Sequence, residues 1–350
     1  MKSKPIKAVA LIILAMIFSC DEPETVITNT VHSDGSVTRK IEMRNVVNKF
    51  TISGSQVPFD STWIVKDSLE IDEDGDTIWV KLAEKRFKNS DEINKAYRTD
   101  SGCNKEISRR TEFSKKFKWF KTEYRFAEII DKTMSAGYPI SEFLNNEELQ
   151  WFYSPEKLTG EKEHGPDSLK FRALNDTVKK KVEKWSIKCF ASEWIHEFVR
   201  LTEGKAGNDL SSEALKIRER EFERLIEANM EKFDSLWSAG MLFNGIIGEA
   251  NALEYKAEAD SAVNLAIEKV FISFSDYTVR IAMPGKVIGT NGFMDSARIS
   301  QWPVKSEFFL SQPYEMWAES KVANKWAWII SGLILLFAMT AILIKARKKG

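Results

Sequence analysis

The sequence predicts an α+β fold with a mainly antiparallel sheet, a helical insert and one C-terminal transmembrane helix. Strand-like segments fill a first block after the leader, and they return at Phe271 in a second block. Between the two blocks, apolar residues recur with the period of a helix. An uncharged stretch of 19 residues, Trp326–Ile344, precedes a basic tail. Strands on both sides of a helical run are typical of one sheet shared by the N- and C-terminal blocks, although two domains divided near residue 137 would leave the same pattern.

The chain begins with the features of a secretory leader. Three lysines precede an apolar run of 11 residues, Ala8–Phe18, which is too short to cross the roughly 30 Å of a bilayer core as a helix. Ile17-Phe18-Ser19-Cys20 resembles a bacterial lipobox, although Phe18 is bulkier than the usual residue there. The resemblance implies a signal peptide at 1–19 and lipidation of Cys20 by acyl chains such as palmitate. The alternative is a secretory signal that is cut elsewhere and leaves Cys20 as a free thiol.

The uncharged stretch near the C-terminus has the length of a membrane-spanning helix, which needs about 20 residues. Trp326 and Trp328 stand where an interfacial aromatic belt is expected, and the basic tail indicates the cytoplasmic side. A buried core helix is the alternative, which the absence of charge disfavours. Spans of the bacterial outer membrane are β-strands. We therefore expect both anchors in the inner membrane, with the bulk of the chain on the periplasmic side.

The first block reads as strands joined by polar turns. Asp34-Gly35 is typical of a tight hairpin turn, and Ser90 is a favourable N-cap for a short helix. The predicted elements of this block are strands at Thr25–Val31, Val37–Met43, Ser68–Ile71 and Thr77–Leu82, a short helix at Ser90–Tyr97, and a long strand at Phe117–Ile130.

The insert reads as four helices. A stripe of apolar residues runs from Phe171 to Val199 and includes Cys189 and His196. Such stripes usually form a packed core, which we favour over a groove for a partner. The predicted helices are Ser141–Phe152, the long helix that carries this stripe, a helix capped by Ser211 or Ser212 with a stripe from Leu215 to Trp237, and Ala259–Val270.

Strands return in the second block and lead into the terminal helix. They are expected at Val270–Met283, Ala297–Trp302, Phe308–Leu310 and Tyr314–Val322. The run Pro284-Gly285, Thr290-Asn291-Gly292 and Trp302, placed just before a terminal membrane helix, resembles uncharacterised bacterial lipoproteins with a β-rich exported domain. The resemblance implies no activity. The expected organisation is a leader at 1–19, a β-rich block at 20–137, a helical insert at 138–269, a β-rich block at 270–324, the transmembrane helix at 325–345 and a cytoplasmic tail at 346–350.

The exported part is moderately acidic. Three of the 51 lysines and arginines lie in the leader, four in the tail and one at Lys325, which leaves 43 against 51 acidic residues and a net charge of −8. The basic residues are scattered, so the sequence offers no footprint for nucleic acid. We expect the membrane as one partner and an envelope protein as a second.

No motif assembles a catalytic, cofactor or metal site. Asp72–Asp76 lacks the glycine and glutamate positions of an EF-hand loop, and a solvated hairpin turn explains it better. His196-Glu197 misses the zinc-protease motif because Arg200 replaces the second histidine. Cys189 and His196 share a helix face but stand about 10.5 Å apart along it, whereas direct proton transfer needs about 3 Å.

With Cys20 assigned to lipid, Cys103 and Cys189 remain. The compartment permits a disulfide between them, but sequence alone does not pair them, and two buried reduced thiols are the default. Two function classes follow. The first is a membrane-anchored envelope lipoprotein that acts as a non-catalytic interaction or assembly module. The alternative is a membrane-tethered enzyme, or a carrier of lipid or another ligand of the envelope.

Overall fold

The computed structural model describes residues 23–347 except 49, 51–56, 58–59, 72–74, 101–106, 155–167, 206–209, 230–240 and 273. These residues form two units. The β unit contains residues 24–129, 277–302 and 315–347, and the helical unit contains residues 130–276 and 303–314. The segment 303–314, which we expected in the second β-rich block, therefore belongs with the helices. Each unit is described by itself below.

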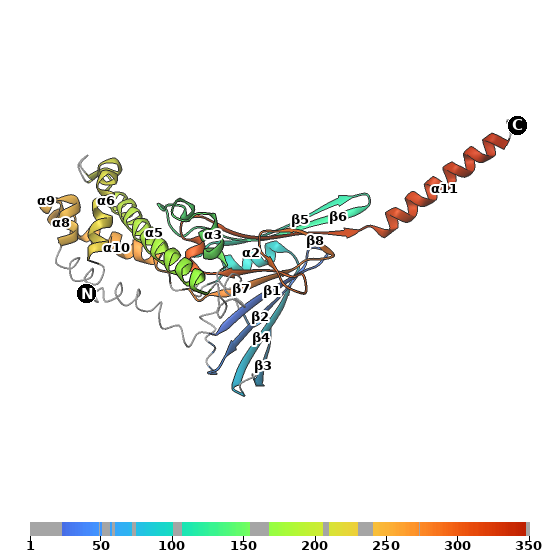
Figure 1. Cartoon of the computed structure of the whole chain (residues 1–350), viewed down its shortest axis with the longest axis horizontal. Coiled ribbons are helices and arrows are strands. Elements are labelled where there is room, and N and C mark those ends of the chain that lie inside the picture. The colour runs from blue at the N-terminus through green and yellow to red at the C-terminus, as the bar shows by residue number, and fades with distance from the viewer. Residues whose placement is uncertain are drawn as a thin grey trace. The chain divides into compact units, whose positions relative to one another are not determined.

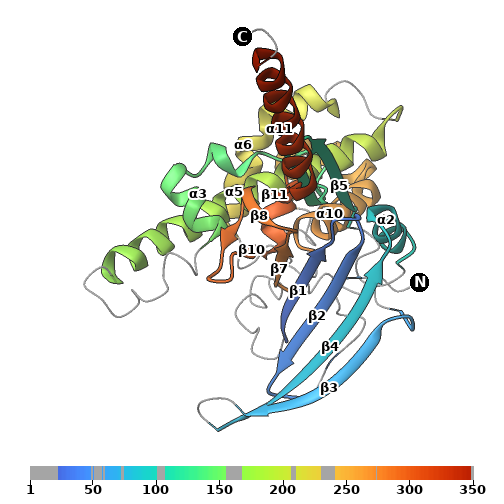
Figure 2. The ribbon, with the colours of Figure 1, turned by 90° about the vertical axis from the view of Figure 1, so that its right-hand side faces the viewer.

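The larger sheet of the β unit has the strand order β3-β4-β2-β1-β7-β10-β9, and Figure 1 and Figure 2 show its first four strands side by side. Its strands are β1 (Glu24–Val31), β2 (Val37–Asn45), β3 (Ile64–Ile71), β4 (Thr77–Phe87), β7 (Tyr277–Ala282), β9 (Phe293–Met294) and β10 (Ser300–Val304). The predicted hairpin is confirmed, because Val31 pairs with Val37 around Gly35, whose φ is +92°. β1 also pairs in parallel with β7, which joins the N- and C-terminal blocks.

A second sheet has the order β5-β6-β11-β8 and again combines both blocks. Its strands are β5 (Arg109–Lys118), β6 (Lys121–Ile130), β8 (Lys286–Thr290) and β11 (Tyr314–Ala323). The α+β class with mostly antiparallel strands from both ends of the chain is thus confirmed, but there are two sheets where we expected one. The expected long strand at Phe117–Ile130 is wrong, because the chain turns at Trp119-Phe120 and forms the β5–β6 hairpin.

The short helix α2 (Ser90–Arg98) is confirmed, but its cap is not Ser90. Asn89 has extended backbone angles, and its side chain accepts a hydrogen bond from the backbone N–H of Glu92. Asn89 is therefore the N-cap, and Ser90 is the first residue of the helix.

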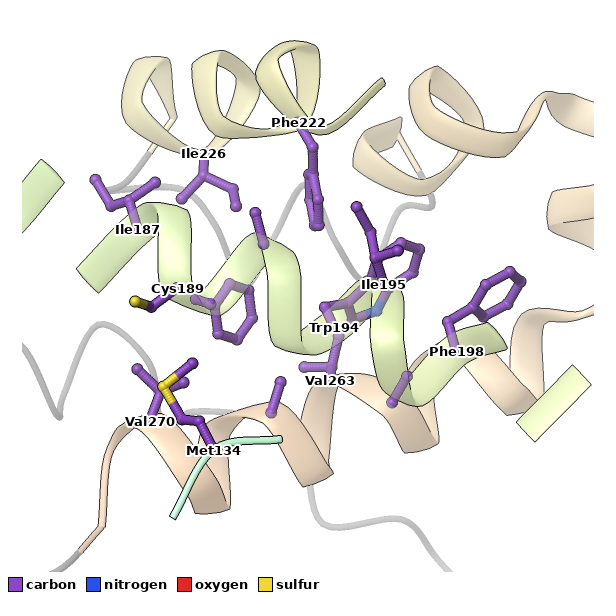
Figure 3. Packing of buried hydrophobic residues seen from close by; sticks show 14 of the residues in the cluster. Met134, Ile187, Cys189, Trp194, Ile195, Phe198, Phe222, Ile226, Val263 and Val270 are labelled. Carbon is purple, nitrogen blue, oxygen red and sulfur yellow. The ribbon is translucent and has the colours of Figure 1, made fainter. Parts of the chain in front are cut away.

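The helical unit is built around one long helix, α5. Its helices are α3 (Asn146–Tyr153), α5 (Ser168–Thr202), α6 (Ser212–Ala228), α8 (Met241–Ile247), α9 (Glu249–Glu254) and α10 (Lys256–Val270). Figure 3 shows α5 between α6, which contributes Phe222 and Ile226, and α10, which contributes Val263 and Val270. Trp194 is fully buried and stacks on Phe198 with the ring centres 5.1 Å apart. The described parts of the predicted stripes therefore form a core, as expected, whereas residues 230–237 of the second stripe lie outside the described residues.

Two expectations in this unit are wrong. His196 is exposed, although we placed it on the buried face of α5; at that level of the helix, Trp194, Ile195 and Phe198 fill the core. Phe308–Leu310 is not a strand, since Ser306–Phe309 forms a 3₁₀ turn in which both phenylalanines are buried.

The last element, α11 (Lys325–Arg347), is a helix long and apolar enough to cross a membrane. Its side chains are almost all exposed, and Ala327 is buried. Such a surface has no favourable contact with water, so the helix favours membrane association. It confirms the predicted C-terminal helix as a candidate span.

Candidate membrane-proximal site

The junction between the second sheet and α11 is a single residue, Asn324, held by the turn of the β5–β6 hairpin. Its backbone N–H donates a hydrogen bond to the carbonyl of Phe120 at 3.0 Å. Its side-chain nitrogen donates to the carbonyls of Lys118 and Trp119 at 2.8 and 3.2 Å. Its side-chain oxygen accepts from the Thr122 hydroxyl at 2.9 Å. Asn324 thus fastens the start of the span to the hairpin turn through both backbone and side chain.

Aromatic side chains of the turn and of the first turns of α11 pack on one another. The ring centres of Trp119 and Trp326 are 5.3 Å apart, and those of Phe120 and Trp328 are 4.4 Å apart. Phe117 stacks on Trp326 at 6.1 Å. All five rings remain at least two-fifths exposed. Large aromatic rings of this kind concentrate at the boundary between hydrocarbon and water, where their apolar faces and polar edges are both satisfied.

A pocket of about 630 Å³ lies beside this aromatic cluster. It is lined by lysines and aromatic residues, together with other residues at the adjoining ends of β8 and β11. The lining residues are Lys118, Trp119, Phe120, Lys121, Gly285, Lys286, Lys321, Val322, Ala323 and Trp328. Four of these ten residues are basic and none is acidic, so the pocket is electropositive.

The four lysines of the pocket fall into two pairs. Lys118 and Lys121 both bind the carboxylate of Glu123, at 2.6 and 2.7 Å. Hydrogen bonds from these two lysines lower the pKa of Glu123 to about 2, so the carboxylate stays ionised and neutralises part of their charge. Lys286 and Lys321 form no ion pair with any residue that the structure describes. They are direct partners in the antiparallel pairing of β8 with β11.

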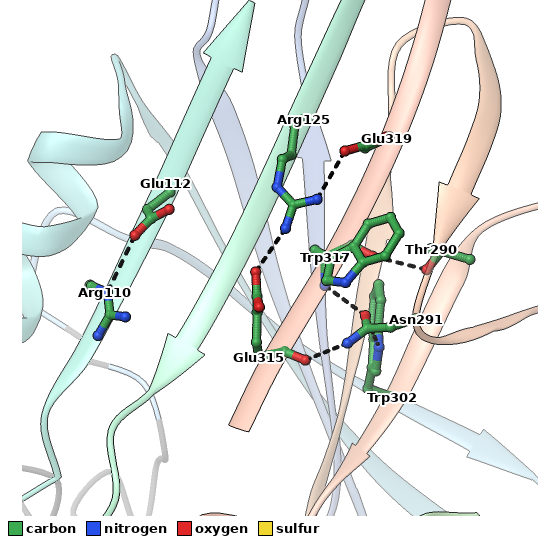
Figure 4. A network of polar contacts seen from close by, with 9 residues as sticks. All are labelled: Arg110, Glu112, Arg125, Thr290, Asn291, Trp302, Glu315, Trp317 and Glu319. Carbon is green, nitrogen blue, oxygen red and sulfur yellow. Dashed lines mark hydrogen bonds and ion pairs between the residues drawn. The ribbon is translucent and has the colours of Figure 1, made fainter. Parts of the chain in front are cut away.

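A separate polar network fixes the same sheet farther from the junction. Figure 4 shows Arg125 between Glu315 and Glu319, with nitrogen–oxygen distances of 2.8 and 2.9 Å. The Arg125 guanidinium also lies 4.7 Å from the centre of the Trp317 ring. Asn291 donates to the carbonyl of Glu315 at 2.7 Å and accepts from the backbone N–H of Trp317. These groups satisfy one another, so the network is best explained as structural: Arg125 joins β6 to β11, and Asn291 joins the turn after β8 to β11.

The acidic residues around His196, which the sequence did not support as a metal or catalytic site, form ion pairs between helices. Glu193 and Glu197, which the sequence places around His196, both bind Lys269 across the α5–α10 interface, at 2.7 and 2.5 Å. Arg200 pairs with Glu197. Since Cys189 is buried and His196 is exposed, the two do not face each other. Among the described residues, no group of histidine, cysteine and acidic side chains could hold a metal ion.

Of the three cysteines, Cys189 lies within the described residues. Cys189 is a free, buried thiol, and burial raises its pKa to about 12. Cys103 and the proposed lipid-bearing Cys20 lie outside the described residues, as do residues 72–74 of the acidic turn. Lipidation and the Cys103–Cys189 pairing therefore stay predictions.

No protein-family model matches the chain, and no curated protein matches it either. Among solved structures, the chain is similar to the folded domain of the LppM protein from Mycobacterium tuberculosis, determined by NMR. The two are 9% identical, the match covers 88% of this chain and 94% of that one, and the TM-score is 0.27. A similarity at this level carries no argument about fold or function. The functional conclusion rests on the geometry of the junction.

Proposed function

We propose that this chain is a membrane-anchored lipoprotein of the bacterial envelope whose exported part is a non-catalytic interaction or assembly module. In this proposal α11 spans the inner membrane, the tail is cytoplasmic, and both units lie on the periplasmic side. The observation that carries it is the Asn324 junction. β11 ends at Ala323 and α11 begins at Lys325, so one residue connects them, and that residue is hydrogen-bonded to the β5–β6 turn.

A short, hydrogen-bonded connection between the sheet and the helix favours an interaction module over an enzyme that acts on a diffusing substrate. A flexible tether is enough to keep an enzyme at a membrane, and it lets the active site meet substrate in many orientations. A surface that must engage a neighbouring envelope protein gains from a fixed height and orientation, because less freedom is lost on binding. The described polar clusters support the same choice, since Lys269 and Arg125 are each held between two carboxylates.

The anchoring is tested by alkaline extraction of membranes and by protease treatment of intact spheroplasts. We expect the full chain to stay in the pellet, its middle to be cleaved from outside, and a C-terminal epitope to be protected. Release of the chain by alkali, or cleavage of the epitope in intact spheroplasts, would contradict the proposed topology.

The module is tested by inserting a flexible Gly-Ser linker between Asn324 and Lys325. A photo-reactive residue at Ile64, an apolar side chain of β3 in the same unit as the junction that is 66% exposed, reports contacts in living cells. We expect a discrete cross-linked protein with the natural junction and its loss with the linker, while membrane retention is unchanged. The same linker inserted at the β3–β4 turn, beside Gly75, is the control and should leave the cross-link intact. A cross-link that survives the junction linker would favour the enzyme or carrier alternative.

A further inference from the structure

The register of β8 against β11 places two lysines opposite each other in the pocket beside the aromatic cluster. Lys286 and Lys321 stand directly opposite each other, where like charges on neighbouring strands repel. Both side chains are exposed, both line the pocket, and neither pairs with a carboxylate among the described residues. A negative group placed between the two ammonium groups would convert this repulsion into two attractive contacts.

The surroundings of the two lysines narrow the chemistry of that negative group. Trp119, Phe120 and Trp328 line the same pocket, and they belong to the aromatic cluster that packs on the first turns of α11. Ser331, in the second turn of the span, accepts a hydrogen bond from Trp119 Nε1 at 2.9 Å. The pocket therefore combines basic residues with aromatic residues that also pack on the candidate span. An occupant that combines an anion with a hydrocarbon chain matches both kinds of lining.

We propose that this pocket binds the headgroup phosphate of an anionic phospholipid. Lys286 and Lys321 hold the phosphate, the aromatic rings of the hairpin turn and of α11 cover the glycerol region, and the acyl chains follow the surface of α11. The lipid comes from the leaflet at the N-terminal end of α11. The inference rests on the proposed function, because it requires α11 to lie in a bilayer.

Gly285 lines the pocket and lies so close to β11 that a side chain has no room there. A Cβ at this position would lie 2.5 Å from the carbonyl oxygen of Lys321 and 2.6 Å from a methyl group of Val322. Glycine therefore permits β11 to approach the residue that precedes Lys286, and Lys286 and Lys321 stay paired at the pocket. The methylene groups of a lysine side chain can cover apolar surface while its ammonium group binds an anion.

Native mass spectrometry of the detergent-purified full chain tests the proposal, with phosphatidylglycerol and phosphatidylcholine supplied in equal amounts. We expect one phosphatidylglycerol to be retained in preference to phosphatidylcholine. In the double variant Lys286→Gln/Lys321→Gln, the preference for phosphatidylglycerol over phosphatidylcholine should fall about fivefold for each lysine removed. The variant Lys286→Arg/Lys321→Arg should keep the preference. The matched control is Lys66→Gln/Lys116→Gln, which removes two exposed lysines of the same unit that lack a described ion pair; it should bind as the natural chain does.

Thermal unfolding supplies a second measurement that does not depend on lipid retention in the mass spectrometer. Without anionic lipid, the double glutamine variant should be at least as stable as the natural chain, because the repulsion is gone. Added phosphatidylglycerol should raise the unfolding midpoint of the natural chain and leave that of the variant unchanged. Equal lipid preference in both proteins, or equal stabilisation of both, would overturn the proposal.

Two further outcomes distinguish lipid binding in the pocket from binding of a free anion and from failure of the proposed function. If excess inorganic phosphate displaces the lipid and gives the same stabilisation alone, the site is one for small free anions and the lipid assignment is overturned. If alkali releases the chain from membranes, the proposed function itself fails. A chain that remains membrane-embedded but shows no preference for phosphatidylglycerol refutes the pocket inference alone.

Discussion

Trp119 Nε1 donates a hydrogen bond to the hydroxyl of Ser331, 2.9 Å away. Ser331 lies six residues beyond the start of α11, about 9 Å along the helix axis. The turn of the β5–β6 hairpin therefore reaches past the first turn of the candidate span. In the proposed topology, this contact and the exposed aromatic rings would place the hairpin turn in the interfacial layer of the membrane.

The first prediction concerns this contact. Trp119→Phe keeps an aromatic ring but removes the donor, and Ser331→Ala removes the acceptor. Each should cost about 1 kcal/mol of local stability, which raises amide hydrogen exchange of Asn324 about fivefold. Mass-spectrometric hydrogen exchange in detergent measures this. If the hydrogen bond is the cause, the double variant should exchange no faster than either single variant; additive effects would point elsewhere.

The second prediction concerns Arg39 of β2, which is fully buried. Its guanidinium donates hydrogen bonds to Glu128, Asn29 and Tyr97. Arg39→Met leaves Glu128 as a buried carboxylate without its cation. We expect a loss of about 3–5 kcal/mol in the unfolding free energy of the β unit. Denaturant-dependent hydrogen exchange at β1 and β2 measures it.

Lys81→Met is the matched control for the buried pair. Lys81 pairs with Asp67 at 3.0 Å, but Asp67 is 66% exposed. Lys81→Met should therefore lower the unfolding free energy by less than about 1 kcal/mol. Similar losses for the two variants would contradict the structural role assigned to the Arg39–Glu128 pair.

The third prediction concerns pH and the α5–α10 interface. Burial raises the pKa of Glu197, but hydrogen bonds from Lys269 and Arg200 outweigh it, so the pKa lies below its ordinary value of 4.5. A lowered folded pKa stabilises the fold above the ordinary value, and this contribution is lost as the pH falls through the folded pKa. Glu197→Gln should therefore destabilise the helical unit by about 1.5–3 kcal/mol at neutral pH and by less below pH 4.5. Thermal unfolding across this pH range tests it; a pH-independent difference would contradict it.

The fourth prediction compares two glycines with positive φ. Gly285 has a φ of +78°, and a Cβ there would collide with Lys321 and Val322, whereas Gly75 has a φ of +86° and open space around it. Gly75→Ala should cost only the backbone strain, about 1–2 kcal/mol. Gly285→Ala adds a clash with β11 that a rigid carbonyl does not relieve, for a total of about 2–5 kcal/mol. Unfolding midpoints of the two variants measure the difference, and equal costs would show that β8 and β11 separate easily.

The fifth prediction concerns Cys189. A buried thiol whose pKa is raised to about 12 is protonated and shielded at neutral pH. It should resist maleimide in the folded chain and react once denaturant is added. Peptide mapping without reductant should recover the Cys189 peptide unlinked. A peptide joined to Cys103 would instead establish the disulfide that the sequence left open.

The elements predicted correctly from sequence are those whose structure is determined by residues close together in the chain. The β1–β2 turn follows from Asp34 and Gly35, because the Asp34 carboxylate accepts from the backbone N–H of Ser36 at 3.0 Å and Gly35 takes a positive φ. The stripe on α5 follows from its 3.6-residue period. The turn at Trp119-Phe120 was missed because aromatic residues occur on both sides of it, and neither glycine nor proline marks the break.

The candidate site depends on pairings between distant parts of the chain. Lys286 and Lys321 are opposite only because β8 and β11 adopt one register, and that register shifts between Glu319 and Ser320. Such an irregularity changes which residues face each other, and the alternation of residue types does not encode it. Asn324 reads in the sequence as an ordinary linker residue. A usable signal was present, since Lys118-Trp119-Phe120-Lys121 repeats the Lys325-Trp326-Ala327-Trp328 combination of basic and aromatic side chains.

The single-residue junction at Asn324 also has a mechanical consequence. Transmembrane helices tilt when the hydrocarbon thickness does not match their length. With Asn324 bonded to Lys118, Trp119 and Phe120, tilt of α11 swings the attached sheet by the same angle, as a rigid lever. In the proposed topology, a change of bilayer thickness would thus change the direction in which the sheet faces without altering its fold.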